Sequence, residues 1–320
     1  MTSASACGKV ILFGEHAVVY GRPAIAVPVS QVRAEAAVEP LPAAGDILLE
    51  APDLGRSYWL SEADSSDGIA HLVRLTLREL GMPARGLRIS VRSALPIGRG
   101  MGSGAAVSTA IVRALCRHFG TDWPAEKVSA LVFEAEKLYH GTPSGIDNTV
   151  IAYEAPVYFI KGQPPALLPI GAPLPLLIAD TGIFSSTREV VGAVREARAR
   201  EPEHCDALFD AIGELVNAAR RSLEAGSIPA LGRLMDENHR LLQALGVSCP
   251  ELDALVQAAK EAGALGAKLS GAGRGGNMIA LVTPERSAAV EQALRAAGAV
   301  RVIFTLVSSP SAEQNHHAVT

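Results

Sequence analysis

The sequence has few aromatic residues and no paired cysteines. Phe, Trp and Tyr together make up 4% of the 320 residues, so Ala, Gly, Leu and Val must supply most of the apolar core. The four cysteines are scattered, with no Cys-x-x-Cys pair: Cys7, Cys116, Cys205 and Cys249. This scatter argues against a disulfide framework and against a zinc site, and it predicts free thiols in a cytosolic protein.

Long apolar runs and a strong net charge are also missing. No apolar run approaches the roughly 20 residues of a membrane-spanning helix, and residues 1–10 lack the pattern of a secretory signal. The formal net charge of −4 argues against a surface dedicated to nucleic acid or to anionic membrane. We therefore expect a cytoplasmic protein without nucleic-acid or membrane partners, in which a local site holds any bound anion.

The patterns that are present predict a mixed α/β fold. Strands are predicted at 9–13, 32–38, 87–96, 155–160, 176–180, 278–282 and 300–307. Helices are predicted at 69–80, 105–119 and 124–140, within 144–154, at several places between 186 and 263, and before the last strand. Pro28 predicts a bulge or a sheet edge, residues 40–68 predict hairpins and loops, and residues 311–320 predict a frayed tail.

A Gly- and Pro-rich stretch at 162–175 separates two halves of the chain. The length of 320 residues is enough for two domains. We place the boundary near Leu168, which gives a first domain at 1–168 and a second at 169–320.

A glycine-rich loop, Gly98-Arg99-Gly100-Met101-Gly102-Ser103-Gly104, joins a predicted strand to a predicted helix. Alternate glycines allow positive φ and close approach of the backbone to a ligand. The free N–H groups of the following helix favour an anion. A tight turn needs fewer glycines, so the loop predicts phosphate binding. It is neither a Walker A loop, because no Gly-Lys-Ser/Thr ends it, nor a dinucleotide fingerprint.

Two carboxylates follow at Glu136 and Asp147. A phosphoryl-transfer enzyme needs a metal ligand and a group that orients or deprotonates the accepting hydroxyl, and these carboxylates fit those roles. The alternative for Asp147 is a helix cap, since Ser144-Gly-Ile-Asp147 resembles a capping box. The alternative for Glu136 is a solvated helix face, since Glu134 and Lys137 lie beside it.

Three further segments carry polar residues near predicted strand ends. The block KLSGAGRGGN at 268–277 is interpreted as a second anion-facing loop or as a tight connector. Residues 180–188 could line a polar cleft or form a turn and an N-cap. His16 is a functional residue or an ordinary core or surface histidine. Lysine is scarce relative to arginine, and both Lys9 and Lys268 lie beside these unusual segments.

Taken together, three blocks in this order resemble the GHMP small-molecule kinases: GKVILFGEHAVVYG at 8–21, LPIGRGMGSGAAVS at 95–108 and KLSGAGRGGN at 268–277. Within this superfamily, the first block and HGTPSGIDNTV at 140–150 are most similar to the mevalonate kinases. DTGIFSSTREVVGAVR at 180–195 and NHRLLQALGVS at 238–248 add to the resemblance. It covers most of the chain.

The resemblance implies a fold and a reaction. It implies a ribosomal-S5-like N-terminal domain with a five-stranded type of sheet and the phosphate loop. The C-terminal domain would be ferredoxin-like, with its last strand returning toward the first domain. The implied reaction is transfer of phosphate from ATP, with Mg²⁺, to the C5 hydroxyl of mevalonate. A homodimer is implied at the level of the family.

The resemblance also implies roles for individual residues. Asp147 would be the base, with Lys9 beside the accepting hydroxyl, where its charge would keep Asp147 ionised. The residues implied near the substrate or the phosphates are Glu15, His16 (hydrogen-bonding the substrate), Thr187, Gly271, Ala272 and Gly273. Those implied to hold ATP are Pro96, Gly98, Arg99, Gly100, Met101, Gly102, Ser103, Gly104 and Ala105, and those implied to hold the metal are Glu136 and Ser103.

Two positions depart from the pattern of the family. Gly104 stands where the family's second loop serine helps to hold Mg²⁺, so Ser103, water or a phosphate oxygen would have to replace it. Arg274 interrupts a glycine run, and it would either point to solvent or contact ATP phosphates. The remaining alternatives are a GHMP kinase for phosphomevalonate, homoserine or another mevalonate hydroxyl, and a catalytically silent ligand sensor.

Overall fold

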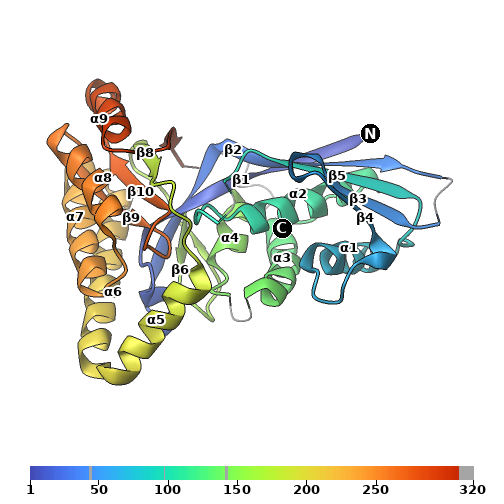
Figure 1. Ribbon diagram of the computed structural model, residues 1–320, viewed down its shortest axis with the longest axis horizontal. Coiled ribbons are helices and arrows are strands. Elements are labelled where there is room, and N and C mark those ends of the chain that lie inside the picture. The colour runs from blue at the N-terminus through green and yellow to red at the C-terminus, as the bar shows by residue number, and fades with distance from the viewer. Residues whose placement is uncertain (43–44, 97, 141–142, 310–320) are drawn as a thin grey trace.

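The computed structural model describes residues 1–42, 45–96, 98–140 and 143–309. It contains two β-sheets, each with its own helices, placed end to end along the long axis of the molecule (Figure 1). The predicted tail at 311–320 lies outside the described residues. Within the described part, no helix is long and apolar enough to cross a membrane.

The first sheet belongs to the N-terminal half of the chain. Its strands are β1 (Thr2–Phe13), β2 (Ala24–Pro40), β3 (Ile47–Ala51), β4 (Arg56–Trp59), β5 (Leu87–Ser93), β6 (Val157–Phe159) and β7 (Ala166–Leu167). They lie in the order β4-β3-β5-β2-β6-β7, with β1 paired to β2. The expected five-stranded sheet is therefore wrong in its count, because the short strands β4 and β7 extend both edges of the described sheet.

Four helices cover one side of this sheet (Figure 1). They are α1 (Gly68–Glu79), α2 (Ser103–His118), α3 (Ala125–His140) and α4 (Ile146–Tyr153). All four predicted helices are confirmed, with ends within two residues of those expected for the first three. The central helix α2 packs against β1 and β2, and its packed residues are mostly small or branched: Ala105, Ala106, Ala110, Ile111 and Val112.

The long strands β1 and β2 differ most from the sequence-based expectation. β1 begins at Thr2, well before the predicted start at Lys9, because Thr2–Cys7 pair with Val38–Arg33 of β2. Cross-strand pairing here outweighs the weak strand preference of small polar residues. The predicted irregularity near Pro28 is confirmed, since the register shifts where Cys7 pairs with Arg33 but Gly8 with Val29.

The second sheet has the strand order β11-β8-β10-β9, with all neighbours antiparallel. Its strands are β8 (Leu174–Asp180), β9 (Gly266–Ser270), β10 (Asn277–Leu281) and β11 (Arg301–Val307). Its helices are α5 (Thr187–Arg200), α6 (Pro202–Glu224), α7 (Ile228–Ala244), α8 (Pro250–Glu261) and α9 (Pro284–Ala296). A first strand flanked by the fourth and third, with the second at the edge, is the ferredoxin-like arrangement that was expected.

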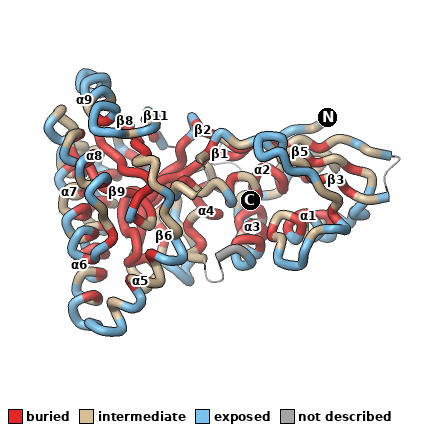
Figure 2. Tube along the Cα trace, in the orientation of Figure 1, coloured by how far each residue is buried: buried red, intermediate tan, exposed pale blue. Residues whose placement is uncertain are grey.

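The two halves of the molecule are docked through apolar and polar contacts. One continuous cluster of buried apolar residues extends through both sheets (Figure 2). β11 lies against β2, which confirms the expected return of the last strand, and Arg301 donates a hydrogen bond to the carbonyl of Ala94 (3.1 Å). The proposed boundary near Leu168 falls in the connector between β7 and β8.

Candidate active site

Lys9 and Asp147 form an ion pair at one end of a cavity. Lys9 lies on β1 with 3% of its side chain exposed, and its Nζ is 2.9 Å from Oδ1 of Asp147. Asp147 occupies the first turn of α4 and remains 34% exposed, so its carboxylate is open to the cavity. The capping-box alternative for Asp147 is borne out only in part: Ser144 Oγ accepts a hydrogen bond from the Ile146 N–H (3.4 Å), but the N-cap position itself is Gly145, which has no side-chain cap.

Glu136 completes the charged group. It lies on α3 and is 6% exposed, so the alternative of a solvated helix face is wrong. Burial, with a smaller effect from Asp147, raises the pKa of Glu136 to about 7, and Lys9 opposes that shift. Lys9, Glu136 and Asp147 line one cavity of about 320 Å³ together with residues from both halves of the chain, including His16, Gly100, Thr187, Gly271 and Ala272. Sequence positions far apart therefore meet in one site.

His16 faces this cavity with a neutral imidazole ring. Burial lowers the pKa of His16 to about 4, so the ring is neutral near pH 7. Its Nε2 lies 2.8 Å from the carbonyl oxygen of Ala272, which can only accept a hydrogen bond. Nε2 therefore carries the proton and Nδ1 is an acceptor. The backbone of His16 has a φ of 59°, an uncommon value for a residue other than glycine.

Glu15 lies next to the cavity but does not line it. It is 1% exposed, and its Oε1 forms a buried ion pair with Lys268 of β9, whose Nζ also donates to the carbonyl of Leu269 (2.6 Å). Burial raises the pKa of Glu15, and Lys268 opposes that shift. The pair joins the end of β1 to the second sheet, a role that the sequence did not reveal for either residue.

The predicted phosphate loop has the expected backbone. Gly98, Gly100 and Gly102 have φ values of 70°, 75° and 70°. Gly102 favours glycine because its φ is left-handed, and a Cβ there would also lie 2.7 Å from Ile151 Cδ1. No side chain caps α2, whose first N–H groups are therefore available to an anion.

The predicted ATP residues of this loop do not all present side chains to a ligand. Met101 and Ala105 are each 1% exposed and pack in the core, so they can offer only backbone groups. The carbonyl of Met101 already accepts from the Lys9 N–H (3.1 Å). Ser103 faces a second cavity, described below. Pro96 precedes the loop and is partly buried.

The second glycine-rich segment lies against the first. A Cβ on Gly271 would be 3.8 Å from the Cα of Gly100, and a Cβ on Gly273 would overlap the carbonyl oxygen of Val247 at 1.9 Å. A narrow cleft between the two segments is also lined by Ser185 and Thr187. The free space between these two backbones is about 10 Å³, enough for a single water-sized group.

Arg274 is directed away from this cleft. Its φ is 55°, its N–H donates to the carbonyl of Val247 (2.8 Å), and its Nε donates to the carbonyl of Gly246 (3.3 Å). Of the two positions that we considered for this side chain, the structure therefore favours the solvent-facing one.

Residues 180–188 combine the two functions that were considered for them. Ser186 caps α5, with its Oγ accepting from the N–H of Glu189 (3.4 Å). Thr187 and Arg188 line the cavity of Lys9 and Asp147. Asp180 ends β8 and accepts from the N–H of Gly182 (2.8 Å).

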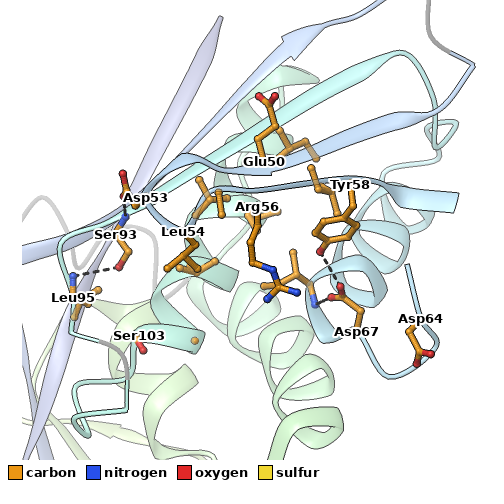
Figure 3. Close-up of a pocket in the computed structure, with 18 of the residues that line it drawn as sticks. Glu50, Asp53, Leu54, Arg56, Tyr58, Asp64, Asp67, Ser93, Leu95 and Ser103 are labelled. Atoms are coloured by element: carbon orange, nitrogen blue, oxygen red, sulfur yellow. Dashed lines mark hydrogen bonds between the residues drawn. The ribbon is translucent and has the colours of Figure 1, made fainter. Parts of the chain in front are cut away.

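A second cavity of about 650 Å³ lies on the other side of the α2 N-terminus (Figure 3). Apolar side chains of β3, β5, α2 and the connector between β5 and α2 form much of its wall: Leu49, Ile89, Val91, Leu95, Val107 and Ile111. Tyr58 reaches across its rim to Asp67 (Oη to Oδ2, 2.8 Å) and Arg56 points into it. Ser103 and Gly104 connect it to the phosphate loop. This cavity could not be predicted from the sequence, because residues 40–68, which contribute much of its lining, carry no recognisable motif.

The donor set near the loop suits Mg²⁺ rather than zinc. Within the described residues, no three His, Cys, Asp or Glu side chains are grouped to hold a metal. Mg²⁺ is commonly bound by one or two carboxylates together with substrate phosphates. Glu136 offers a carboxylate of this kind, and Ser103 offers a hydroxyl oxygen from the side of the second cavity. A Cβ on Gly104 would lie 3.2 Å from Glu136 Oε1, so the position without a serine is next to the buried carboxylate.

Comparisons with known proteins agree with this architecture. The family described as "GHMP kinases N terminal domain" matches residues 68–155, and "GHMP kinases C terminal" matches residues 201–300. Together with the two-sheet fold and the apposed glycine-rich loops, these matches define the class of the protein, a GHMP kinase, for which ATP is the co-substrate.

Matches to individual proteins show to which branch of the GHMP kinases the chain belongs. The mevalonate kinase of Thermococcus sibiricus is 39% identical over 94% of both chains, and that of Pyrococcus horikoshii is 38% identical over the same share. The crystal structure of L. major mevalonate kinase in complex with R-mevalonate superposes with a TM-score of 0.83 and 30% identity, covering 98% of this chain and 97% of that one. The chain belongs to the mevalonate kinase family.

Proposed function

We propose that the protein transfers the γ-phosphoryl group of ATP to the C5 hydroxyl of mevalonate. The observation that carries this proposal is the Lys9–Asp147 ion pair, which lies open to a cavity that residues of both glycine-rich loops help to line. It combines a carboxylate for the hydroxyl proton with a fixed positive charge beside it. The similarity to mevalonate kinases over 94% of the chain supports the choice of substrate.

The nucleotide would lie across the N-terminus of α2. Its base and sugar fit the apolar cavity of about 650 Å³, which the sequence motif alone did not predict. Its phosphates would pass Ser103 and Gly104 and run along the first glycine-rich loop toward the cavity of Lys9 and Asp147. There the backbone N–H groups and the helix dipole stabilise negative charge.

Mevalonate would occupy the cavity of about 320 Å³. It is a carboxylic acid with two hydroxyl groups. Arg188 and Arg195 line the end of the cavity formed by α5, where cationic side chains suit a carboxylate. The Nδ1 acceptor of His16 suits a hydroxyl donor, and Ile11, Val18 and Ile146 suit the methyl group. This orientation leaves the C5 hydroxyl for Asp147.

Catalysis would depend on position and charge. Asp147 accepts the proton of the hydroxyl as that oxygen attacks phosphorus in line, and the transfer involves no covalent enzyme intermediate. Lys9 stabilises the developing alkoxide and the transferring phosphoryl oxygens. Glu136 and Ser103 would hold Mg²⁺, which neutralises charge on the β- and γ-phosphates when it is bound.

The test is ADP release from Mg-ATP with mevalonate, phosphomevalonate, homoserine or galactose as acceptor. We expect turnover on mevalonate and a loss of at least 100-fold in kcat for Asp147→Ala, in the range for removal of a general base. Turnover only on another acceptor would mean that the protein is a kinase but that mevalonate is not its substrate. Binding of ATP and mevalonate without turnover would favour a ligand sensor.

We also propose that the enzyme acts in the cytoplasm. All four cysteines are free and three of them are buried, which suits a reducing compartment. A homodimer is proposed from the family resemblance alone, and sedimentation of the purified protein tests it.

A further inference from the structure

Arg99 is the charged side chain in a loop that otherwise consists mainly of glycine. The loop's partial positive charge would come from N–H groups, whereas Arg99 adds the full charge of a guanidinium group. Arg99 lines the narrow cleft between the two glycine-rich segments, together with Ser185, Thr187 and Gly276. Under the proposed function, the phosphates of ATP run along this loop, and the cleft, of about 10 Å³, has room for a single phosphate oxygen.

The second domain holds Arg99 in place. Nε of Arg99 lies 3.6 Å from Oδ2 of Asp180, the last residue of β8, whose side chain is 8% exposed. The carbonyl of Arg99 accepts a hydrogen bond from the side-chain amide of Asn277, the first residue of β10 (2.5 Å). Side chain and backbone are therefore both anchored to the second sheet, although the loop belongs to the first domain.

One edge of the guanidinium group is left for a ligand. Nη1 of Arg99 is buried and has no hydrogen-bond partner in the described part of the chain. A buried donor without a partner is unfavourable, and the long Nε contact to Asp180 satisfies only the other edge. A phosphate oxygen in the cleft would supply the missing acceptor, and guanidinium binds phosphate with well-defined geometry.

We propose that Arg99 binds a phosphate oxygen of the nucleotide and that Asp180 is the positioning residue that orients its guanidinium group. The phosphate site is then completed by the second domain. This inference rests on the proposed function, because it uses the place assigned there to ATP.

Binding without an acceptor substrate tests the proposal. Calorimetry would compare ATP, ADP and adenosine on the wild-type protein and on Arg99→Ala, Arg99→Lys and Asp180→Asn. We expect Arg99→Ala to weaken ATP and ADP at least tenfold and adenosine less than twofold. Arg99→Lys keeps the positive charge but lacks the planar guanidinium group, so its affinity for ATP should lie between those of the wild type and Arg99→Ala. Asp180→Asn should weaken ATP a few-fold. In kinetics, the KM for ATP should rise, with the KM for mevalonate unchanged.

Arg301→Ala is the matched control. Arg301 also joins the second domain to the segment before the loop, through the carbonyl of Ala94, but it does not line the cleft. It should lower the thermal midpoint without weakening ATP binding. The proposal is overturned if Arg99→Ala and Arg99→Lys bind ATP within twofold of the wild type. If the wild type itself does not bind ATP, the proposed function fails as well.

Discussion

At the scale of single residues, the site depends on charges that are buried close to one another. Lys9 and Asp147 are in direct contact, and Glu136 is buried beside them. The positive charge of Lys9 stabilises this group, because it offsets the repulsion between the two carboxylates and part of the cost of burying them. Gly104 and His16 modify this group in ways that single substitutions can test.

Gly104 is expected to set how tightly Mg²⁺ is held. A serine there would place its side chain beside Glu136, since a Cβ would already be 3.2 Å from Oε1. We expect Gly104→Ser to lower the Mg²⁺ concentration for half-maximal activity several-fold. Gly104→Ala is the control, because it also removes a helical glycine, worth about 1 kcal/mol, but adds no oxygen. Equal Mg²⁺ dependence in the two variants would contradict the expectation.

His16 is expected to make the protein sensitive to acid. Its pKa is lowered to about 4 by burial, so in mild acid the unfolded chain binds a proton that the folded chain does not. Stability should therefore fall as pH drops from about 6.5 to 4, by up to about 3 kcal/mol from this group. His239, whose pKa is also lowered by burial, acts in the same direction.

His16→Gln provides the comparison. Its amide N–H can replace Nε2 toward Ala272, and it does not titrate in this range. Urea denaturation at pH 7 and pH 5 should show a smaller loss of unfolding free energy for the variant than for the wild type. The same loss in both proteins would mean that His16 is not the group responsible.

At the scale of elements, glycines set how closely helices and loops approach. Gly232 of α7 lies against β9, where a Cβ would come within 2.2 Å of the carbonyl oxygen of Leu265. This contact involves backbone, so a side chain cannot be accommodated by a change of rotamer. The close approach of α7 to β9 therefore requires glycine at this position, as it does at Gly266 on the facing strand.

Gly232→Ala is expected to destabilise the protein by about 2 kcal/mol, within the range for overpacking. Gly192→Ala in α5 is the matched control, because no atom lies within 4 Å of the added Cβ. The control should stabilise by up to about 1 kcal/mol through helix propensity. Thermal unfolding of the two variants measures the difference. A neutral Gly232→Ala would mean that α7 can move away from β9 at little cost.

At the scale of the whole molecule, the two domains are joined where the active site lies. The Glu15–Lys268 ion pair is buried between the end of β1 and β9. Ser270 Oγ bonds both the N–H (3.1 Å) and the carbonyl (2.8 Å) of Ile11 nearby. The same contacts that dock the domains thus hold the glycine-rich segments against each other.

Lys268→Met is expected to cost about 3–5 kcal/mol, because it leaves the charge of Glu15 buried without a partner. The double variant Glu15→Gln with Lys268→Met removes both charges and should recover part of this loss. Urea denaturation followed by the circular dichroism of the whole chain measures both. If the double variant is no more stable than Lys268→Met, the buried charge is not the cause.

The sequence by itself determined much of the fold and the chemical character of the site. Alternating apolar residues and glycine or proline stops predicted the α-helices and most of the longer strands, because these preferences arise between near neighbours. They did not predict the short strand β7 or the edge strand β9, which is formed by pairing with β10. Alternate glycines before a helix predicted an anion-binding loop for the same local reason. The motif at 140–150 identified Asp147, although only through its resemblance to a family.

Only the tertiary structure decided which of these residues act together. It brought Lys9 to Asp147, buried Glu136, turned Glu15 toward Lys268 and revealed the large apolar cavity beside α2. It also placed the guanidinium of Arg99 against the second domain. Burial and distance between residues far apart in sequence depend on how whole elements pack, and no local pattern of residues encodes that packing.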